Sequence, residues 1–332
     1  MADDNPVIAK HVIVVGAGAM GRDIAAMFLG GGSRIEVVLR DSSKVEVTRE
    51  GIAVSVAETG HDFEPSRLMI RSGMHATDWR NADLVVEAVP EDLAMKRAIF
   101  SDIAGRVARD AIVASNASAI PISAITEGLS LDHNAIGMHF FLPAHLVPLV
   151  EIVRGQNTNP AVANRAVSML RAAGRTPVLV NRDTPGFLAN RIQHAMMREV
   201  FAVIDEGLAS PEDVDAAVRY SFGMRFLAAG PLMQKELSGL DTQMAAASSI
   251  YPVLANNAEP GPILAEKVKQ GHTGLKALQG FWRWTPDEAE RVREEFRTAL
   301  MQSLNLLNRI DQAASHFDAL SAASTDEVES SH

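Results

Sequence analysis

The sequence predicts an α/β domain built on a parallel sheet, followed by a domain made only of helices. Two observations predict this division. Up to residue 181, short apolar runs alternate with helical patterns, which is typical of parallel sheets covered by helices. After a break at Asp183-Thr184-Pro185-Gly186, strand patterns disappear and only helical periodicity remains. We therefore expect domains at residues 1–183 and 184–312, with a flexible tail at 313–332 that is rich in Ala, Ser and acidic residues.

Composition narrows the classes of function. The 332 residues suffice for two domains, and the 47% of hydrophobic residues supports a large core. A net charge of −10 disfavours nucleic acid and anionic membrane as partners. The chain has no cysteine, which removes thiolate metal sites and fits a reducing cytoplasm. The N-terminus lacks a signal-peptide pattern and no apolar run approaches membrane-spanning length, so we expect a cytoplasmic protein without a metal.

A glycine pattern opens the first α/β unit. Residues 11–15 predict a strand and a helical pattern begins soon after; between them stands Gly16-Ala17-Gly18-Ala19-Met20-Gly21. Strand, Gly-x-Gly-x-x-Gly and helix in this order are the context of a Rossmann-like dinucleotide-binding domain. Gly16 makes the tight turn, Gly18 lets the backbone approach the pyrophosphate, and Gly21 lets helix and strand pack closely. A sharp strand–helix turn without a ligand is the alternative.

An acidic residue closes the second strand, which we expect at 35–40. Asp41 at this position would accept hydrogen bonds from the adenosine ribose and repel a 2′-phosphate, which favours NAD over NADP. The neighbouring Arg40 can accommodate such a phosphate and weakens the inference. Asp41 can also serve as the cap of a helix that starts at Ser42.

The remaining elements follow from periodicity and breakers. In the first domain we expect further strands at 67–71, 84–89, 111–115 and 176–181, two short strands within 136–153, and helices at 43–64, 93–107 and 160–173. In the second domain we expect helices at 187–207, 211–220, 232–250, 263–270 and 286–308.

The stretch 136–153 carries the strongest candidate for catalysis. Glu151 lies within an apolar run, where a carboxylate is costly to bury without a partner. His139, twelve positions earlier at the end of another apolar run, is a suitable partner. A histidine oriented by a buried carboxylate is a common general base. A purely structural His–Glu pair remains the alternative.

Two polar residues stand where ligands gather in such folds. The strand at 111–115 runs into Asn116-Ala117-Ser118, at what would be a carboxyl end of the sheet. Ser118 is either a cap for the next turn or a hydroxyl contact to a substrate. Asn190 lies in the first turn of the helix that leaves the domain boundary, where it either contacts a ligand or is simply solvated.

Six segments, in this order, resemble the L-3-hydroxyacyl-CoA dehydrogenase family, which also contains enzymes of free acids such as carnitine and gulonate dehydrogenases. The resemblance covers roughly residues 10–285. The segments are Val-Gly-Ala-Gly-Ala-Met-Gly, Val-Glu-Ala-Val-Pro-Glu-Asp-Leu, Ser-Asn-Ala-Ser, Gly-Met-His-Phe-Phe, Pro-Leu-Val-Glu-Ile-Val and Pro-Gly-Phe-Leu-Ala-Asn-Arg. Six ordered motifs are much more specific than the glycine pattern alone.

The resemblance implies NAD-dependent oxidation of a 3-hydroxy group. It makes His139 the catalytic base and Glu151 its orienting carboxylate. It places Ser118 and Asn190 around the hydroxyl and carbonyl groups of the substrate, with Ser118 also near the cofactor.

The resemblance also implies cofactor contacts outside the glycine pattern and a mode of assembly. It assigns them to Glu91, Lys96 and Lys276, the last of which precedes the late Gly280-Phe281. For Lys96 it also implies a contact with the CoA. It further implies that the helical domain forms a homodimer.

The chain departs from the family at several positions. Leu142 stands where the family has Asn after His-Phe-Phe, and the segment after Asp41 is poor in the lysines that hold CoA phosphates. Gly223-Met224-Arg225 resembles the free-acid members. The leading expectation is a 3-hydroxyacyl-CoA substrate. The alternative is a small free 3-hydroxy acid held by Arg225, whose guanidinium can bind a carboxylate through two hydrogen bonds.

Two other classes of protein remain as rivals. The β-hydroxyacid dehydrogenases related to phosphogluconate dehydrogenase share the glycine pattern but use a lysine on the interdomain helix, and residues 187–207 contain none. A catalytically silent NAD-binding structural or sensor protein would not need His139, Glu151, Ser118 and Asn190 together.

Overall fold

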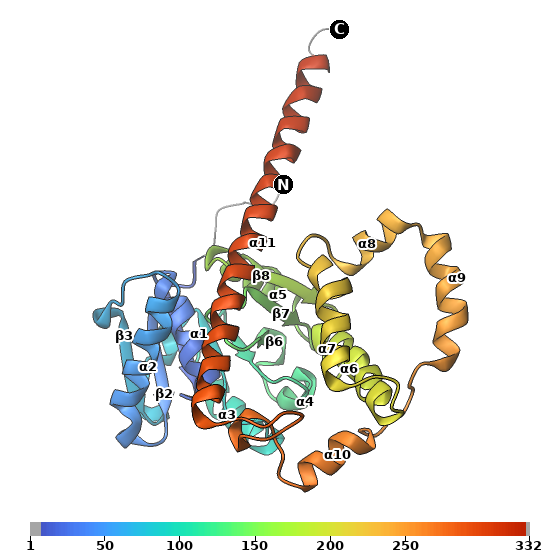
Figure 1. Ribbon diagram of the computed structural model, residues 1–332. Helices are drawn as coiled ribbons and strands as arrows, with labels where there is room; N and C mark the ends of the chain where they lie inside the picture. The colour runs from blue at the N-terminus through green and yellow to red at the C-terminus, as the bar shows by residue number, and fades with distance from the viewer. Residues whose placement is uncertain (1–7, 330–332) are drawn as a thin grey trace. The chain divides into compact units, whose positions relative to one another are not determined.

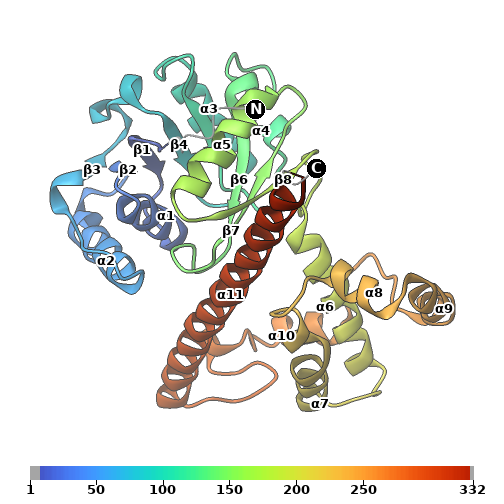
Figure 2. The same cartoon turned by 90° about the horizontal axis from the view of Figure 1, so that it is seen from above.

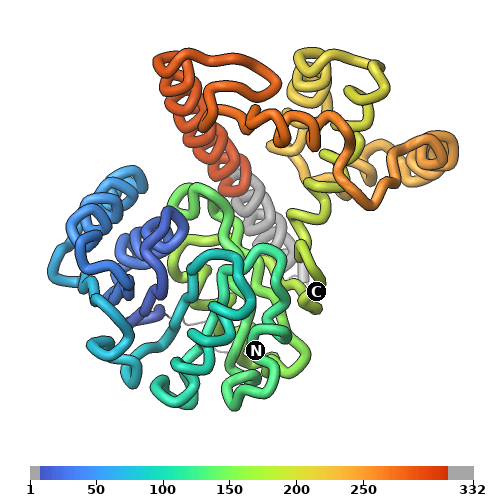
Figure 3. The backbone as a smooth tube through the Cα atoms, turned by 90° about the horizontal axis from the view of Figure 1, so that it is seen from below, coloured from blue at the N-terminus to red at the C-terminus, as the bar shows by residue number. Residues whose placement is uncertain are grey.

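The computed structural model describes residues 8–329, and the side chains of residues 8–312 (Figure 1). The chain divides between Arg191 and Ile192 into two compact units. Figure 3 draws the first unit in blue to green and the second from yellow onward. The border expected at residues 183/184 lies shortly before this division, and the expected domain limits stay a prediction.

The first unit contains an eight-stranded sheet in the order β3-β2-β1-β4-β5-β6-β7-β8. Neighbouring strands pair in parallel, except that β6 and β7 are antiparallel. The strands are β1 (His11–Val15), β2 (Arg34–Leu39), β3 (Leu68–Ser72), β4 (Leu84–Glu87), β5 (Ile112–Ser115), β6 (Ala135–Phe140), β7 (Leu149–Val153) and β8 (Thr176–Val180).

Helices cover both faces of this sheet, so its central strands are buried on each side. Along β1, Val12 and Val14 join one apolar core while Ile13 and Val15 join the other, as the alternation of side chains along a strand requires. The helices of the first core are α1 (Ala19–Gly30), α2 (Val45–Glu58) and α5 (Pro160–Ala172), and those of the second are α3 (Leu93–Ala104) and α4 (Ile122–Thr126). Figures 1 and 2 show α1 and α2 side by side.

Two local differences from the expected elements have simple causes. The helix expected at 43–64 ends at Glu58, because Gly60 takes a left-handed φ of 76° and stops it before Pro65. The short α4 was not expected, because five residues are too few to display helical periodicity.

In the part of the second unit that the structure describes, the regular elements are helices joined by loops, with two isolated bridges near residue 279. One helix expected at 232–250 is two helices, separated by Gly239 with a φ of 90°. The helices are α6 (Ala189–Asp205), which crosses the division, α7 (Pro211–Val218), α8 (Pro231–Ser238), α9 (Leu240–Ile250), α10 (Pro262–Lys269) and α11 (Pro286–Glu329).

The predicted fold class, an α/β dinucleotide-binding domain followed by an all-helical domain, is confirmed. The helix α11 extends past residue 308, where the sequence-based helix ended. Residues 330–332 of the expected tail lie outside the described residues, and flexibility of the tail stays a prediction. Among the residues that the structure describes, no helix is long and apolar enough to cross a membrane.

Candidate active site

His139 and Glu151 lie directly opposite each other in the antiparallel pair of β6 and β7. The Nδ1 atom of His139 is 2.7 Å from Oε2 of Glu151, and both side chains are buried. The pairing inferred from the sequence is therefore present, and the ladder that joins the two strands holds it in place.

The second oxygen of Glu151 binds the start of α6. Oε1 accepts hydrogen bonds from the backbone N–H groups of Leu188 at 3.0 Å and Ala189 at 2.7 Å. Burial, the largest single influence, opposes the charge of Glu151, but the bonds from His139, Ala189 and Leu188 outweigh it and lower the pKa of the carboxyl. Because an ionised carboxylate only accepts, Nδ1 of His139 carries a proton, and in the neutral ring Nε2 can receive another.

Two aromatic rings enclose the imidazole, and sequence reasoning missed both. The ring centroid of Phe141 lies 4.5 Å from that of His139, and Phe187 lies at 5.5 Å, both edge-on. Phe187 is buried and has a φ of 48°, an uncommon conformation for a bulky residue that costs about 1–3 kcal/mol. The aromatic after His-Phe and the Pro-Gly-Phe turn were the available signals. These rings limit access of water to the histidine.

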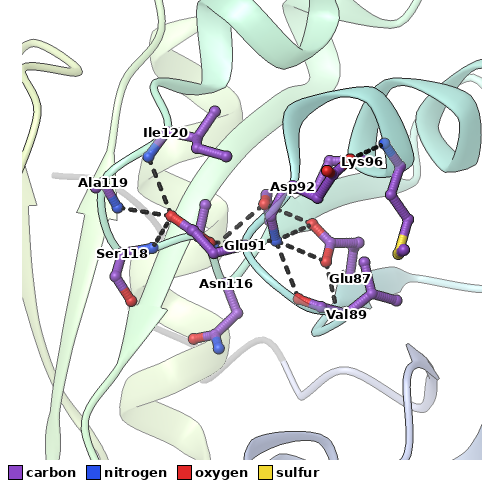
Figure 4. Close-up of polar contacts among 12 residues, drawn as sticks. Glu87, Val89, Glu91, Asp92, Lys96, Asn116, Ser118, Ala119 and Ile120 are labelled. Carbon is purple, nitrogen blue, oxygen red and sulfur yellow. Dashed lines mark hydrogen bonds and ion pairs between the residues drawn. The ribbon is translucent and has the colours of Figure 1, made fainter.

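Ser118 lies in a loop that Glu91 organises (Figure 4). One carboxylate oxygen of Glu91 accepts the consecutive backbone N–H groups of Ser118 at 3.0 Å, Ala119 at 2.9 Å and Ile120 at 3.2 Å. The hydroxyl of Ser118 is exposed and has no hydrogen-bond partner among the described residues. Its backbone is therefore fixed while its side chain stays available to a ligand.

The loop of Ser118 and the side chain of His139 reach the same edge of the sheet. The strands β5 and β6 are parallel neighbours, and Ser118 and His139 stand at or just beyond their carboxyl ends. Asn116 ties the two segments together, because its Oδ1 accepts the backbone N–H of Phe140 at 2.9 Å. This edge is where ligands bind in open parallel sheets.

Lys96 is turned into the protein. Its Nζ donates to Glu87 at 2.9 and 3.1 Å and to the carbonyl oxygen of Val89 at 3.3 Å (Figure 4). The nearest oxygen of Glu91 is 3.6 Å from Nζ. A direct contact of Lys96 with the cofactor, which the resemblance implies, stays a prediction. In the structure its partners are the carboxylates that support this edge of the sheet.

The glycine loop has the shape that a dinucleotide requires. Gly16 has a φ of 114°, and a Cβ there would lie 2.6 Å from the carbonyl oxygen of Ala88. A Cβ at Gly21 would lie 2.0 Å from the carbonyl oxygen of Gly16. A Cβ at Gly18 would meet no protein atom within 4 Å, and no side chain caps α1 there. The space beside Gly18 and the free donors of the first helical turn therefore fit a pyrophosphate.

Asp41 lies two residues after Leu39, the last residue of β2. Its Oδ1 accepts hydrogen bonds from the backbone N–H of Ser43 at 3.0 Å and from the Ser43 hydroxyl at 2.6 Å, and these bonds lower the pKa of the exposed Asp41 carboxyl. Asp41 is thus a helix cap, while its second oxygen can still accept from a ribose. A helix cap and an acceptor for the adenosine ribose, the two interpretations of Asp41 from the sequence, are therefore compatible.

Three further candidates lie at or beyond the division of the chain. Asn190 is half-buried in the first turn of α6, beside the N–H groups that Glu151 binds. Arg225 and Lys276 belong to the second unit, and both are exposed. Lys276 lines a cavity of about 1400 Å³ within that unit, together with Phe281 and Trp282.

This combination of a parallel sheet, a dinucleotide loop and a carboxylate-oriented histidine at one sheet edge defines an NAD-dependent dehydrogenase. Residues 11–184 match the model of the 3-hydroxyacyl-CoA dehydrogenase NAD-binding domain, and residues 186–284 match that of the 3-hydroxyacyl-CoA dehydrogenase C-terminal domain. The chain belongs to the 3-hydroxyacyl-CoA dehydrogenase family. The resemblance, the cofactor NAD and the oxidoreductase class acting on CH–OH are thereby confirmed.

Three similar proteins span both substrate types. A probable 3-hydroxybutyryl-CoA dehydrogenase of Deinococcus radiodurans is 34% identical over 281 residues, 82% of this chain and 99% of the relative. The crystal structure of a 5-formyl-3-hydroxy-2-methylpyridine 4-carboxylic acid 5-dehydrogenase, an NAD+ dependent dismutase, matches with a TM-score of 0.85 at 27% identity. The match covers 91% of this chain and 99% of that chain. The structure of the (S)-3-hydroxybutyryl-CoA dehydrogenase PaaH1 from Ralstonia eutropha matches with a TM-score of 0.68 at 30% identity. The match covers 83% of this chain and 99% of that chain.

Proposed function

We propose that this chain oxidises the alcohol carbon of a small hydroxy compound with His139 as the general base. The observation that carries the proposal is the 2.7 Å bond that fixes the His139 ring to Glu151. Nε2 of His139 takes the proton of the substrate hydroxyl, and Glu151 stabilises the imidazolium that forms. NAD, when bound, accepts the hydride from the alcohol carbon of the substrate. In the reverse direction His139 donates the proton.

Two polar residues hold the reacting oxygens in this proposal. The unpartnered hydroxyl of Ser118 and the amide of Asn190 would bind the hydroxyl and carbonyl oxygens of the substrate. The Glu91 bonds to the loop of Ser118 and the Glu151 bonds at the start of α6 preorganise both segments. Glu91, Lys96 and Lys276 remain proposed cofactor contacts on the basis of the family resemblance.

For the substrate, we favour a small free carboxylic acid over an acyl-CoA. The dehydrogenase of a pyridine carboxylic acid has a TM-score of 0.85, against 0.68 for the 3-hydroxybutyryl-CoA enzyme. The segment from Asp41 to Pro65 contains a single lysine, Lys44, so it offers little to the phosphates of CoA. Arg225 is exposed, and a guanidinium can bind a carboxylate through two hydrogen bonds.

A 3-hydroxyacyl-CoA is the second candidate. Both matching domain models describe acyl-CoA dehydrogenases, and together they cover residues 11–184 and 186–284. The chemistry at His139 is the same for either substrate, because the base acts on the hydroxyl and not on the carboxyl end.

A substrate panel tests this proposal. NADH formation is measured with 3-hydroxybutyrate and 3-hydroxybutyryl-CoA, which carry an alcohol carbon, and with 5-formyl-3-hydroxy-2-methylpyridine-4-carboxylate. In the pyridine compound the 3-hydroxyl is phenolic, so the hydride would leave from the hydrated 5-formyl carbon and His139 would take the proton of a hydroxyl on that carbon. For the best substrate, His139→Gln should lower kcat by roughly 10²–10⁴ while NADH still binds. His133→Gln, at an exposed histidine, is the matched control and should leave kcat unchanged. Near-wild-type turnover of His139→Gln would refute the base.

Arg225 separates the two substrate classes. If a free acid is the substrate, Arg225→Met should raise KM by roughly tenfold to a hundredfold without changing NADH affinity, because a charge-assisted pair is lost. Arg291→Met, at an exposed arginine of α11, is the control. An acyl-CoA preference together with unchanged kinetics of Arg225→Met would remove the carboxylate contact from the proposal.

We further propose a cytoplasmic homodimer that assembles through the helical unit. Large apolar side chains are strongly exposed along α8, α9 and the turn that follows, among them Leu232, Leu237, Met244 and Val253. An exposed apolar surface of this kind supports an interface with a second copy of the chain. Light scattering should give twice the 35.7 kDa of one chain; the monomer mass over a wide range of concentrations would contradict this.

A further inference from the structure

A buried histidine outside the dyad bridges two helices of the first unit. His145 lies in the connection between β6 and β7, and it is 6% exposed. Its Nε2 is 2.6 Å from Oε2 of Glu58, the last residue of α2. Its Nδ1 is 3.1 Å from Oδ1 of Asp23 in α1, a charge contact that is too bent to be a good hydrogen bond. One imidazole therefore faces a carboxylate from each of two helices.

Asp23 holds the same connection by a second contact. Its Oδ2 accepts the backbone N–H of Ala144 at 3.1 Å, and its Oδ1 accepts the hydroxyl of Ser55 in α2 at 3.0 Å. Two successive residues of the β6–β7 connection, Ala144 and His145, are thus fixed to one buried carboxylate. That carboxylate lies on the helix that begins at Gly18, the proposed pyrophosphate site.

A protonated imidazole matches the charges of this cluster. A neutral imidazole donates from only one nitrogen, whereas the protonated ring presents an N–H group to each of the two carboxylates. Burial is the largest influence on His145 and opposes its charge, but the contacts with Asp23 and then Glu58 outweigh it and raise the pKa of the ring. Asp23 on α1 and Glu58 on α2 are the ionisable groups that contact it.

The connection that His145 anchors also sets the surroundings of the base. Phe141, the residue after β6, places its ring 4.5 Å from the ring of His139. Ala144 is buried in the apolar core that contains Phe140, the neighbour of His139. A shift of the connection would therefore move the aromatic wall of the base, although His145 itself is not in contact with His139.

We infer that His145 is a positioning residue, which uses its bridge to Asp23 and Glu58 to hold the β6–β7 connection, and with it the aromatic wall of His139, against the pyrophosphate helix α1. This inference rests on the proposed function for its meaning in catalysis. The bridge is complete below the ordinary pKa of histidine, and it is lost as pH rises through the raised pKa of His145. The surroundings of His139 therefore change at a pH that His145 sets.

The test needs no substrate, which separates it from the test of His139 as base. Imidazole NMR of the full chain with NADH present follows the ring signals of His139 and His145 as pH rises. The His139 signals should show a second inflection at the pKa of His145, because the ring of Phe141 shifts their resonance. In His145→Gln this second inflection should vanish, while His133→Gln should retain it.

Amide exchange gives an independent readout of the same bridge. Protection factors of the segment 141–148 should fall across the titration of His145, because the neutral ring no longer holds both carboxylates. They should be low and independent of pH in His145→Gln. His145→Lys, whose charge persists to higher pH, should restore protection above the wild-type transition. A single inflection of His139 together with flat protection in the wild type would overturn the inference.

Discussion

Lys96 and Glu87 form an ion pair of 2.9 Å in which the two side chains are 1% and 0% exposed. Ser115 adds a hydroxyl donor to the same carboxylate at 2.7 Å, and the backbone N–H of Val89 adds another at the same distance. A carboxylate this deeply buried is tolerable only because its lone pairs are occupied. The pair therefore supports the edge of the sheet from which the loop of Ser118 begins.

We expect Lys96→Met to destabilise the fold by about 3–5 kcal/mol, because it leaves the Glu87 charge buried without its main partner. Urea unfolding of the two proteins measures the difference. Arg49→Met, which removes a partly exposed ion pair with Glu46 at 3.7 Å, is the control and should change stability by about 0.5 kcal/mol or less. Wild-type stability with a raised KM for NAD would instead place Lys96 at the cofactor.

Acid should weaken the fold in part through Glu151. The folded state lowers the pKa of this carboxyl, so its contribution to stability is present above the ordinary pKa of glutamate and is lost as pH falls through the lowered value. Glu151→Gln should be less stable at neutral pH and lose less stability over that acidic interval. The comparison requires unfolding free energies at several pH values. Equal acid slopes in both proteins would rule out the coupling.

Two glycines of the loop should respond differently to the same substitution. Gly18→Ala adds a methyl group where no protein atom lies within 4 Å, so the fold should persist while the affinity for NADH falls. Gly21→Ala places its Cβ 2.0 Å from the Gly16 carbonyl oxygen, so the melting temperature should fall as well. Fluorescence titration with NADH and thermal unfolding separate the effects. Unchanged NADH affinity in Gly18→Ala would contradict the pyrophosphate site.

The choice between NAD and NADP should depend on Asp41. Like charges set against each other cost several kcal/mol, so kcat/KM with NAD should exceed that with NADP by about a hundredfold or more. Asp41→Asn keeps an acceptor for Ser43 but removes the charge, and it should reduce the ratio by about tenfold or more. Arg40→Met should raise the ratio of kcat/KM with NAD to that with NADP, because it removes a cation that could bind the 2′-phosphate. Comparable use of both cofactors by the wild type would refute this role of Asp41.

The dyad could be predicted from the sequence because its cause is local. A glutamate within an apolar strand needs a partner, and the short connection after His139 makes an antiparallel neighbour the natural source. The capping of Ser43 by Asp41 was likewise an alternative that adjacent residues suggested. Both follow from contacts between residues that are close in the chain or lie on paired strands.

The missed features depend on contacts between distant parts of the chain. Asp23 contacts the β6–β7 connection across a long stretch of chain, since Ala144 and Asp23 are 121 positions apart, and no sequence periodicity indicates this contact. The Phe187 ring reaches His139 only because the turn at Gly186 holds Phe187 at a positive φ. The split at Gly239 required knowledge of a backbone angle, since a glycine inside a helical pattern is compatible with an unbroken helix.

The hydrogen bonds between Glu151 and the start of α6 determine where a fragment that contains the first domain must end. A fragment that stopped at residue 183 would keep all eight strands and yet lack the Leu188 and Ala189 donors, which leaves a buried carboxylate oxygen unsatisfied. If the helical halves of two relatives were exchanged after residue 183, the N–H groups of residues 188 and 189 would come from one relative and Glu151 from the other. The exchangeable module therefore ends beyond Ala189, inside a helix and not in the loop that precedes it.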